Sequence, residues 1–413
     1  MKGSRLHQID VNNAFLNREL TKDIFMDQPP GFEVLGVDGQ KLVCKLNKAL
    51  YGLRQAPRAW FHTLMQFLID KLGFSASKAD PSLFLRTSST GQVYLMAYVY
   101  DIVLTGSSNA EIDSVVQQLQ DRFALKDMGR LIFFLGIEVK YTPQGLLLSQ
   151  RKYIQELLHK TGMTDAAATP TPMVGTLKLV ASDDSQPFAY GYLYRSTVGM
   201  LQYLCITRPD LSFCVNKLSQ YMNSPSDTHW RGVKRVLRYL SGTMEHGLLL
   251  SDGSFQLVGY SDADWASSVE DRRSTTGYVI YLGANPIAWC SKKQAVVSKS
   301  YSEAKYCSLA NCVSELLWVK QLLEELGLVL QQTSVITPPL LQCQQIQPIM
   351  HVSNMFKLTT ILFVKKFRMV LSRLTSFHQL IRLQTCLQSL SRCLRIFDVH
   401  LKLQLKKIKS LQD

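Results

Sequence analysis

The chain has 413 residues, 46% of them hydrophobic, so it is long enough for two or three domains that each bury a core. No apolar run approaches the roughly 18 residues that a membrane helix needs, so we expect no membrane partner. The net charge of +14 is uneven: residues 328–413 hold 12 Lys and Arg against only Asp398 and Asp413. Charge therefore says little about what the first 327 residues bind.

The N-terminal part of the chain alternates strand-like and helix-like segments. Residues 94–104 predict two apolar strands joined by a turn beside Asp101, and residues 112–123 predict an amphipathic helix. Residues 164–194 are rich in Ala, Thr, Pro, Ser and Asp, which is typical of a linker.

Residues 195–250 are predicted to be helical, and the clearest helix spans residues 227–240, before Gly242. Four basic residues lie on one face of this helix: Arg231, Lys234, Arg235 and Arg238. We call them the basic stripe. Two interpretations stay open, a solvated helix face or a surface that contacts nucleic-acid phosphates.

Residues 255–327 change pattern again. Three strands are predicted, at residues 256–262, 276–282 and 286–291. A long amphipathic helix then spans residues 302–326, with Ser302 as its N-cap and Gly327 just past its end. Strands followed by a helix in this order indicate an α+β domain.

The last segment, residues 328–413, contains no Gly, Ala, Trp or Tyr. At ordinary usage a segment of this length would hold about six glycines. We expect an irregular, poorly ordered tail that packs little against the rest of the chain.

Four acidic residues are candidates for metal binding: Asp10, Asp101, Asp262 and Glu303. Each is flanked by apolar residues at a predicted strand end, turn or helix start. Carboxylates brought together in this way can hold two metal ions for phosphoryl transfer. Taken singly, such an acid is more often a cap, a turn residue or a surface charge.

A series of motifs occurs along residues 1–327 in one order. They are residues 8–17 (QIDVNNAFLN), 28–32 (QPPGF), 50–60 (LYGLRQAPRAW), 98–101 (YVYD), 134–139 (FLGIEV), 194–204, 207–210 (TRPD), 260–265 (YSDADW), 271–278 and 302–306 (SEAKY). Together they resemble the reverse transcriptase and RNase H region of copia-type LTR retrotransposon Pol polyproteins.

This resemblance implies a multidomain α+β fold. Its parts would be a palm and thumb at residues 1–163, a helical connection at 195–250 and a partial RNase H-like domain at 255–327. The implied polymerase metal ligands are Asp10 and Asp101, on adjacent strands. The implied RNase H ligands are Asp262 and Glu303, facing each other. The implied metal is Mg²⁺, with Mn²⁺ as a substitute, and no small-molecule cofactor is expected.

The resemblance also implies substrates and partners. The ancestor would use an RNA or DNA template-primer and deoxynucleotides, inside a cytoplasmic virus-like particle. Phe15 would lie beneath the sugar of the incoming nucleotide, and Gln55 would contact that nucleotide. A plain core aromatic remains the alternative for Phe15.

The sequence departs from the family in three ways. It begins at the first palm motif, which predicts that the fingers are absent. Tyr100 stands where the family has a metal-binding aspartate. The later RNase H acids are missing. We therefore expect a decayed copy without polymerase activity, which Tyr100→Asp alone does not restore.

The tail suggests how the decay arose. Residues 383–392 can be encoded by the nucleotides of Leu-Ala-Asp-Met-Phe-Thr-Lys-Ser-Leu-Pro, a sequence typical of the family, read one base out of register. This indicates an upstream frameshift; a diverged but genuine tail is the alternative. For function, the two hypotheses are an RNA-directed DNA polymerase with RNase H, and a non-catalytic remnant that binds nucleic acid or a partner.

Overall fold

A computed structural model describes residues 5–17, 23–53, 55–174, 179–182 and 185–337. These residues form seven α-helices and several sheets, so the mixed α and β character predicted from the sequence is confirmed. Residues 338–413 lie outside the described residues, and with them the expectations about most of the tail and its frameshift.

The first sheet has six strands in the order β4-β5-β6-β7-β1-β8. Their bounds are β1 His7–Val11, β4 Ser75–Ala76, β5 Leu83–Thr87, β6 Gln92–Tyr98, β7 Asp101–Gly106 and β8 Leu125–Arg130. The strand–turn–strand prediction at residues 94–104 is confirmed by β6 and β7. The central strand β1, from the start of the described chain, lies between β7 and β8.

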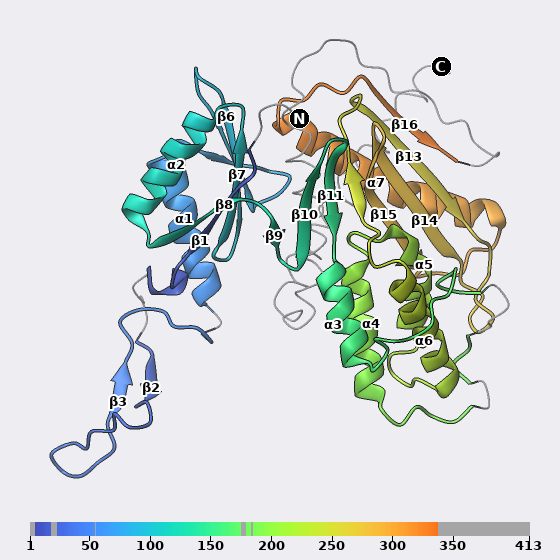
Figure 1. The fold of residues 1–413 in the computed structure, drawn as a ribbon, viewed down its shortest axis with the longest axis horizontal. Helices are drawn as coiled ribbons and strands as arrows, with labels where there is room; N and C mark the ends of the chain where they lie inside the picture. Colours follow the sequence, from blue (N-terminus) through green and yellow to red (C-terminus); the bar gives the residue numbers. More distant parts are fainter. Residues whose placement is uncertain (1–4, 18–22, 54, 175–178, 183–184, 338–413) are drawn as a thin grey trace, which may run out of the picture. The chain divides into compact units, whose positions relative to one another are not determined.

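Helices α1 (Ala56–Asp70) and α2 (Asn109–Arg122) cover one face of this sheet (Figure 1). The apolar face predicted for the second helix is confirmed, because its Ile112, Val115 and Leu119 are fully buried. They share a core with Trp60 of α1 and with alternate strand residues such as Ile102. The buried aliphatic side chains hold β1 and β7 in one register, which positions the site described below.

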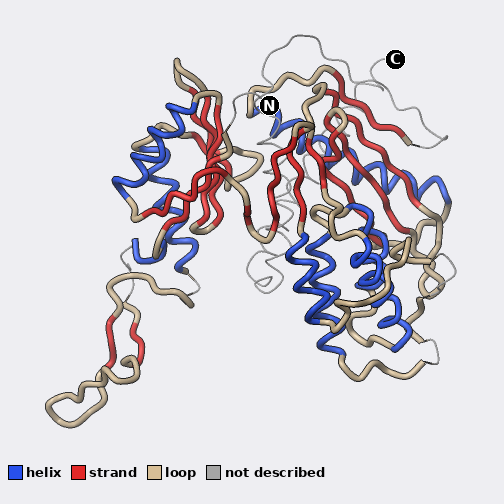
Figure 2. The backbone as a smooth tube through the Cα atoms, viewed as in Figure 1, coloured by secondary structure: helices blue, strands red, loops and turns tan. Residues whose placement is uncertain are grey.

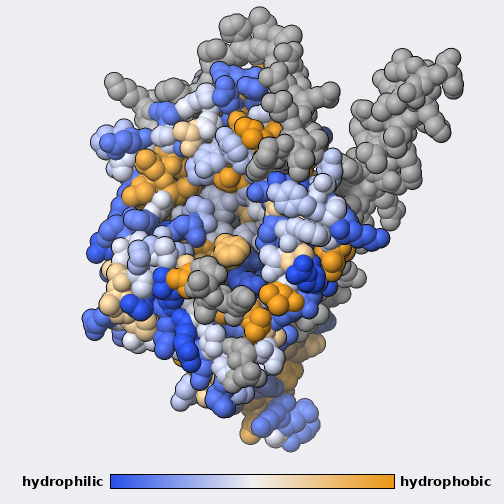
Figure 3. All heavy atoms as spheres, turned by 90° about the vertical axis from the view of Figure 1, so that its right-hand side faces the viewer, coloured by the Kyte–Doolittle hydropathy of each residue, from blue (hydrophilic) through white to orange (hydrophobic). Residues whose placement is uncertain are grey.

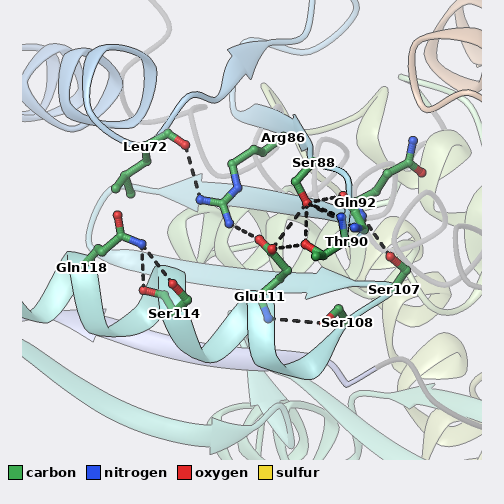
Figure 4. Close-up of polar contacts among 11 residues, drawn as sticks. Leu72, Arg86, Ser88, Thr90, Gln92, Ser107, Ser108, Glu111, Ser114 and Gln118 are labelled. Carbon is green, nitrogen blue, oxygen red and sulfur yellow. Dashed lines mark hydrogen bonds and ion pairs between the residues drawn. The ribbon is translucent and has the colours of Figure 1, made fainter.

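A polar cluster fixes the β5–β6 turn to α2 (Figure 4). Glu111 accepts hydrogen bonds from Arg86 and Thr90, and Ser108 caps the helix by accepting from Glu111 N. The hydrogen bond from Thr90 is the largest cause that holds the pKa of Glu111 below its usual value. Burial opposes it, and the hydrogen bond and charge of Arg86 lower the pKa further. The helix is therefore tied to the sheet at its N-terminal end by ionic as well as apolar contacts.

A separate hairpin pairs β2 (Phe25–Asp27) with β3 (Val43–Lys45), and loops flank both strands (Figure 2). Gln28, of the QPPGF motif, stabilises the loop that connects β2 to β3. Its side-chain amide donates to Val34 O and Leu42 O, both at 2.8 Å. Phe32 is 77% exposed and contributes nothing to a core.

The second sheet has the order β12-β11-β10-β9. Its strands are β9 Phe133–Phe134, β10 Ile137–Thr142, β11 Gly145–Ser149 and β12 Leu248–Leu250. Because β12 falls within residues 195–250, the prediction that this whole region is helical is wrong at its end. Three leucines there pair with Leu146–Leu148 of β11, a partner that local sequence pattern does not reveal.

Four helices and one 3-10 turn form a further core. They are α3 Arg151–Lys160, α4 Gly191–Leu204, η2 Pro209–Leu211, α5 Ser212–Ser219 and α6 Asp227–Gly242. Helix α6 begins as predicted, with a capping box between Ser226 and His229. The described part of residues 164–194 packs on α6 through hydrogen bonds such as Ser241 Oγ to Ala166 O, 3.2 Å.

The third sheet has the order β15-β14-β13-β16 and packs on α7. The elements are β13 Gln256–Ala263, β14 Thr275–Leu282, β15 Asn285–Lys293, α7 Tyr301–Glu325 and β16 Gln332–Ile336. The three predicted strands and the long helix are confirmed. The predicted N-cap is wrong: Ser300, not Ser302, caps α7, because its hydroxyl accepts from Glu303 N at 3.1 Å.

The start of the predicted tail also differs. Strand β16 runs parallel to β13, and Leu328, Leu330 and Thr333 are buried. The expectation of a poorly packed tail from residue 328 onward is therefore wrong as far as Ile336. Leu328 and Leu330 lie between α7 and β16 and are buried together with Thr333 of β16, so the packed fold continues past Gly327.

Within the described ranges, no helix is long and apolar enough to cross a membrane. On the face drawn in Figure 3, hydrophobic residues form separate groups among hydrophilic ones.

Candidate active site

Two aspartates face each other across the centre of the first sheet. Asp10 on β1 is the register partner of Asp101 on β7. In an antiparallel pair, directly opposite side chains lie on the same face with Cβ atoms about 4.5–5.5 Å apart. The prediction that these residues lie on adjacent strands is confirmed, and both carboxylates project from one face of the sheet.

The charge on this aspartate pair is not neutralised within the described chain. Burial raises the pKa of Asp101, the hydrogen bond from Gln8 Nε2 at 3.3 Å lowers it, and the negative charge of Asp10 raises it again. Among the described residues, no Lys or Arg forms an ion pair with either carboxylate. Two close carboxylates of this kind fit a hard divalent cation such as Mg²⁺, which prefers oxygen ligands.

The turn between β6 and β7 is held in an unusual conformation. Val99 has a φ of +51°, a region that β-branched residues rarely adopt. The buried Trp60 donates its indole N–H to Val99 O, and Val11 N donates to Tyr100 O at 2.9 Å. The turn is thus fixed from the helix and from β1. Such strain persists where the surrounding structure determines the conformation, and it is common at functional sites.

Tyr100 lies beside the two carboxylates. Burial, then the negative charges of Asp101 and Asp10, raise the pKa of its phenol above the ordinary value. The hydroxyl is therefore neutral near pH 7 and is a weaker ligand for Mg²⁺ than a carboxylate. No group of three or more His, Cys, Asp or Glu residues that could hold a metal ion is found within the described residues.

Phe15 and Gln55 differ in their surroundings. Phe15 is 6% exposed in the 3-10 turn Ala14–Asn17, and its ring lies 4.5 Å from that of Tyr51. Gln55 is exposed at the start of α1, where its carbonyl accepts from Ala59 N at 2.9 Å. Phe15 is thus a core aromatic by burial, which is compatible with a role beneath a nucleotide, and Gln55 has a side chain that a ligand can reach.

Asp262 and Glu303 have different hydrogen-bond and ion-pair partners. The Asp262 carboxylate accepts from Ala263 N at 2.8 Å and lies 3.3 Å from Lys305 Nζ. Glu303 instead accepts from Lys299 N at 2.7 Å. No hydrogen bond or ion pair joins the two acids in the described part of the chain. Lys305 is therefore the residue of α7 that pairs with Asp262, and the placement of Glu303 opposite Asp262 stays a prediction.

The basic stripe divides into two halves. Arg235 Nη2 donates to Thr171 Oγ1 at 2.9 Å, and Arg238 Nε donates to Ala167 O at 2.7 Å. These two side chains hold the segment that crosses α6. Arg231 and Lys234 make no hydrogen bond or ion pair within the described residues, so they are the members that a ligand could engage.

Sequence reasoning missed four residues that shape these sites: Gln8, Tyr51, Trp60 and Lys305. Gln8 carried a usable signal, because on a strand it shares a face with Asp10 two residues later. The other three reach their sites through tertiary contacts that no local pattern reveals.

The chain is similar in sequence to known proteins over most of its length. Residues 1–175 match the family model described as reverse transcriptase (RNA-dependent DNA polymerase). The retrovirus-related Pol polyprotein from transposon RE2 of Arabidopsis thaliana is 46% identical over 342 residues, covering 83% of this chain and 23% of that protein. The Pol polyprotein from transposon TNT 1-94 of Nicotiana tabacum is 36% identical over 78% of this chain and 25% of its own length.

A shorter relative is matched over its whole length. It is a transposon Ty5-1 protein of Saccharomyces cerevisiae, 32% identical over 313 residues, which are 75% of this chain and 100% of that protein. The chain belongs to the copia-type, retrovirus-related Pol polyproteins of transposons, and its N-terminal part is their reverse transcriptase domain. It spans about a quarter of the length of the RE2 and TNT 1-94 polyproteins.

The unneutralised aspartate pair leads to a prediction about stability. Asp10→Asn removes the like charge opposite Asp101, so without divalent metal it is expected to raise the free energy of unfolding at pH 7. The expected gain is on the order of 1 kcal/mol, the usual scale of a single substitution. The raised pKa of Asp101 also means that the contribution of this one carboxyl to stability becomes more favourable as the pH falls, because the folded state takes up the proton first.

Urea denaturation in EDTA at pH 5 and pH 7 measures both effects. Asp121→Asn, at an exposed position of α2, is the matched control and should change nothing. A loss of stability in Asp10→Asn would show that the two carboxylates do not repel each other.

Proposed function

We propose that this chain is the polymerase and RNase H-like segment of a retrotransposon Pol polyprotein, and that its polymerase site is inactive. The observation that carries the first half is the cross-strand pair of Asp10 and Asp101 within a reverse transcriptase domain. In this proposal the first sheet with α1 and α2 is the palm, and the hairpin of β10 and β11 with α3 belongs to the thumb.

Asp10 and Asp101 would hold Mg²⁺, or Mn²⁺ in its place. When bound, the metal would supply charge stabilisation for transfer of a nucleotidyl group. The chain's own side chains position the reactants: Phe15 beneath the sugar, Gln55 at the nucleotide, and Gln8 orienting Asp101 by its hydrogen bond. The substrates would be an RNA or DNA template-primer and deoxynucleotides.

Loss of activity is proposed from Tyr100. Its phenol stands next to both carboxylates, in the place where the family has a third acid, and it cannot supply a negative oxygen near pH 7. A metal contributes several kcal/mol to such a reaction, so loss of one ligand is expected to lower the rate by on the order of a thousandfold.

Metal binding tests the assignment of the site directly. Electron paramagnetic resonance of free Mn²⁺ titrated with the full chain should show binding that Asp10→Asn and Asp101→Asn each weaken. A weakening of at least about 10–100-fold is expected, because loss of an outer-shell partner of a metal ligand already costs that much. Asp121→Asn serves again as the control. Equal Mn²⁺ binding by all four proteins would refute the metal site.

Residues 256–336 are proposed to form the RNase H-like part. Support comes from the mixed sheet of β13, β14, β15 and β16 on α7, in which Asp262 of the inner strand β13 contacts α7 through Lys305. We propose Asp262 as the nuclease metal ligand. The assignment of Glu303 to the same metal has no support from its contacts.

A second candidate function is that of a non-catalytic remnant that binds nucleic acid. The observation that favours it is the pair of basic side chains on α6 that make no ion pair within the described residues, Arg231 and Lys234. If they contact phosphates, removing both should weaken binding of single-stranded RNA and reduce its dependence on salt.

The expected change for Arg231→Ala with Lys234→Ala is a decrease of about 1.4 in the slope of log K against log salt, at roughly 0.7 for each phosphate contact with a single strand. Fluorescence anisotropy with labelled RNA at several salt concentrations measures this slope. Lys320→Ala on α7 is the control. An unchanged slope would leave the basic stripe a solvated helix face. Reading the coding DNA in all three frames independently tests the decayed-copy interpretation.

A further inference from the structure

A lysine side chain forms an ion pair with Asp262, whose own side chain is 58% exposed. Lys305 Nζ lies 3.3 Å from Asp262 Oδ1, and the lysine side chain is only 9% exposed. The ammonium group also lies 4.5 Å from the centre of the Tyr301 ring, one helical turn earlier. Lysine is rarely buried unless it is paired, and here the carboxylate and the ring face are its partners.

The position of this lysine is fixed by the fold. Ser308, one turn further along α7, donates its hydroxyl to Asp262 O at 2.7 Å and to Gly277 O at 3.1 Å. Ser308 is fully buried and also contacts Ser261 Oγ at 2.9 Å. These bonds fasten α7 directly over the strand pair that carries Asp262. The ammonium group is therefore held at the carboxylate by the packing of helix on sheet.

Among the described residues, no second acid forms an ion pair with Lys305. Glu303 is bound to the backbone of Lys299, and Asp264 accepts from Thr275 N at 2.6 Å and from Ser267 Oγ at 2.7 Å. The Asp262 site thus contains one carboxylate with one ammonium group on it. The residues present do not fit a divalent metal, which would meet a fixed positive charge at the position of its first ligand.

We propose that Lys305 is a built-in counter-cation that neutralises Asp262 and excludes divalent metals from the RNase H-like site. The tethered ammonium competes at high effective concentration, since it is part of the same folded unit. The nuclease site is therefore closed by a single side chain of α7, independently of the change at Tyr100 in the polymerase site. This inference rests on the proposed assignment of Asp262 as the nuclease ligand.

Mn²⁺ binding by the full chain tests the proposal. Eight proteins are compared. The unmodified chain, Lys305→Glu, Lys305→Gln and the control Lys320→Gln are each prepared with and without Asp262→Asn. The difference in Mn²⁺ binding between the two forms gives the Asp262-dependent binding, because binding at Asp10 and Asp101 is common to both forms. We expect no Asp262-dependent binding in the unmodified chain or in Lys320→Gln. In Lys305→Glu we expect an additional site, at least about tenfold tighter than any Asp262-dependent binding of the unmodified chain, given the usual effect of one metal-site residue.

Lys305→Gln removes the charge with little change of volume and should bind Mn²⁺ more weakly than Lys305→Glu but more tightly than the unmodified chain. If repulsion between the introduced glutamate and Asp262 destabilises the Lys305→Glu protein, a thermal melt followed by circular dichroism will show it. The Lys305→Gln protein then still provides the test. Asp262-dependent binding in the unmodified chain would overturn the exclusion by Lys305 while leaving Asp262 a metal ligand. No Asp262-dependent binding in either Lys305 variant would overturn both the exclusion and the nuclease assignment.

Discussion

Primer extension by the unmodified chain is expected to be undetectable with Mg²⁺, and Tyr100→Asp is expected to strengthen Mn²⁺ binding at Asp10 and Asp101. The reason is local, because the Tyr100 backbone is fixed beside Asp10 by the hydrogen bond from Val11 N at 2.9 Å. An aspartate at this position would add a third carboxylate to a site that has two. We expect a gain of at least about 10–100-fold in Mn²⁺ affinity, because even an outer-shell partner changes metal affinity by that much.

Tyr100→Phe is the matched control, since it removes the hydroxyl without adding a charge, and it should bind Mn²⁺ as the unmodified chain does. Asp101→Asn in the Tyr100→Asp background should abolish the gain. Primer extension on a primed RNA template is measured on the same proteins. Robust extension by the unmodified chain would contradict the proposal that this copy is inactive.

The second large effect is expected at Arg208. Its guanidinium is 2% exposed and binds Asp210 with two bonds, Nη2 to Oδ2 at 2.7 Å and Nε to Oδ1 at 3.0 Å. It also donates to Thr243 O and Thr243 Oγ1, both at 2.9 Å, which ties the 3-10 turn to the end of α6. Asp210 in turn accepts from Tyr239 at 2.9 Å.

The two partners of this pair are buried unequally, so their removal should cost different amounts. The Asp210 side chain is 37% exposed, whereas Arg208 has almost no access to water. Asp210→Ala leaves a buried guanidinium unpaired and is expected to destabilise the chain by about 3–5 kcal/mol. Arg208→Met leaves a carboxylate that water can reach and is expected to cost less, about 1–3 kcal/mol.

Urea denaturation followed by circular dichroism measures both losses. The control is Glu324→Ala, which breaks an exposed pair with Lys320 and should cost under about 1 kcal/mol. Burial opposes ionisation of Asp210, but the hydrogen bonds and charge of Arg208 hold the pKa of Asp210 below its usual value. This contribution is therefore present at neutral pH and is lost as the pH falls through the lowered pKa, a loss that Asp210→Ala should not show. Equal stability of Asp210→Ala and the unmodified chain would exclude a structural role for this pair.

Local patterns were sufficient for elements whose signals lie within a few residues. The apolar arms around the turn predicted β6 and β7, and the i, i+3, i+4 spacing predicted α2 and α6. The N-cap of α7 was misplaced by two residues because Ser300 and Ser302 are both good caps, and only the backbone conformation selects between them.

Partners distant in the sequence could not be predicted in this way. Strands β12 and β16 pair with β11 and β13, and nothing in three leucines or in a Gln-Thr-Ser segment specifies those neighbours. The contact of Lys305 with Asp262 was missed for a related reason. Residues 303 and 305 lie on different sides of a helix, and the packing of α7 on the sheet, which no local pattern reveals, brings residue 305 to Asp262.

The pairing of β11 with β12 has a consequence for how the chain is made. Residues 146–148 cannot pair until residues 248–250 have been synthesised, and roughly 100 residues separate the two segments. At about 5–20 residues per second the first half leaves the ribosome roughly 5–20 s before its partner. During that interval an edge of three leucines is open to other nascent chains. Chaperone dependence and translation speed should therefore affect the yield of this protein more than they affect the segment ending at Arg130.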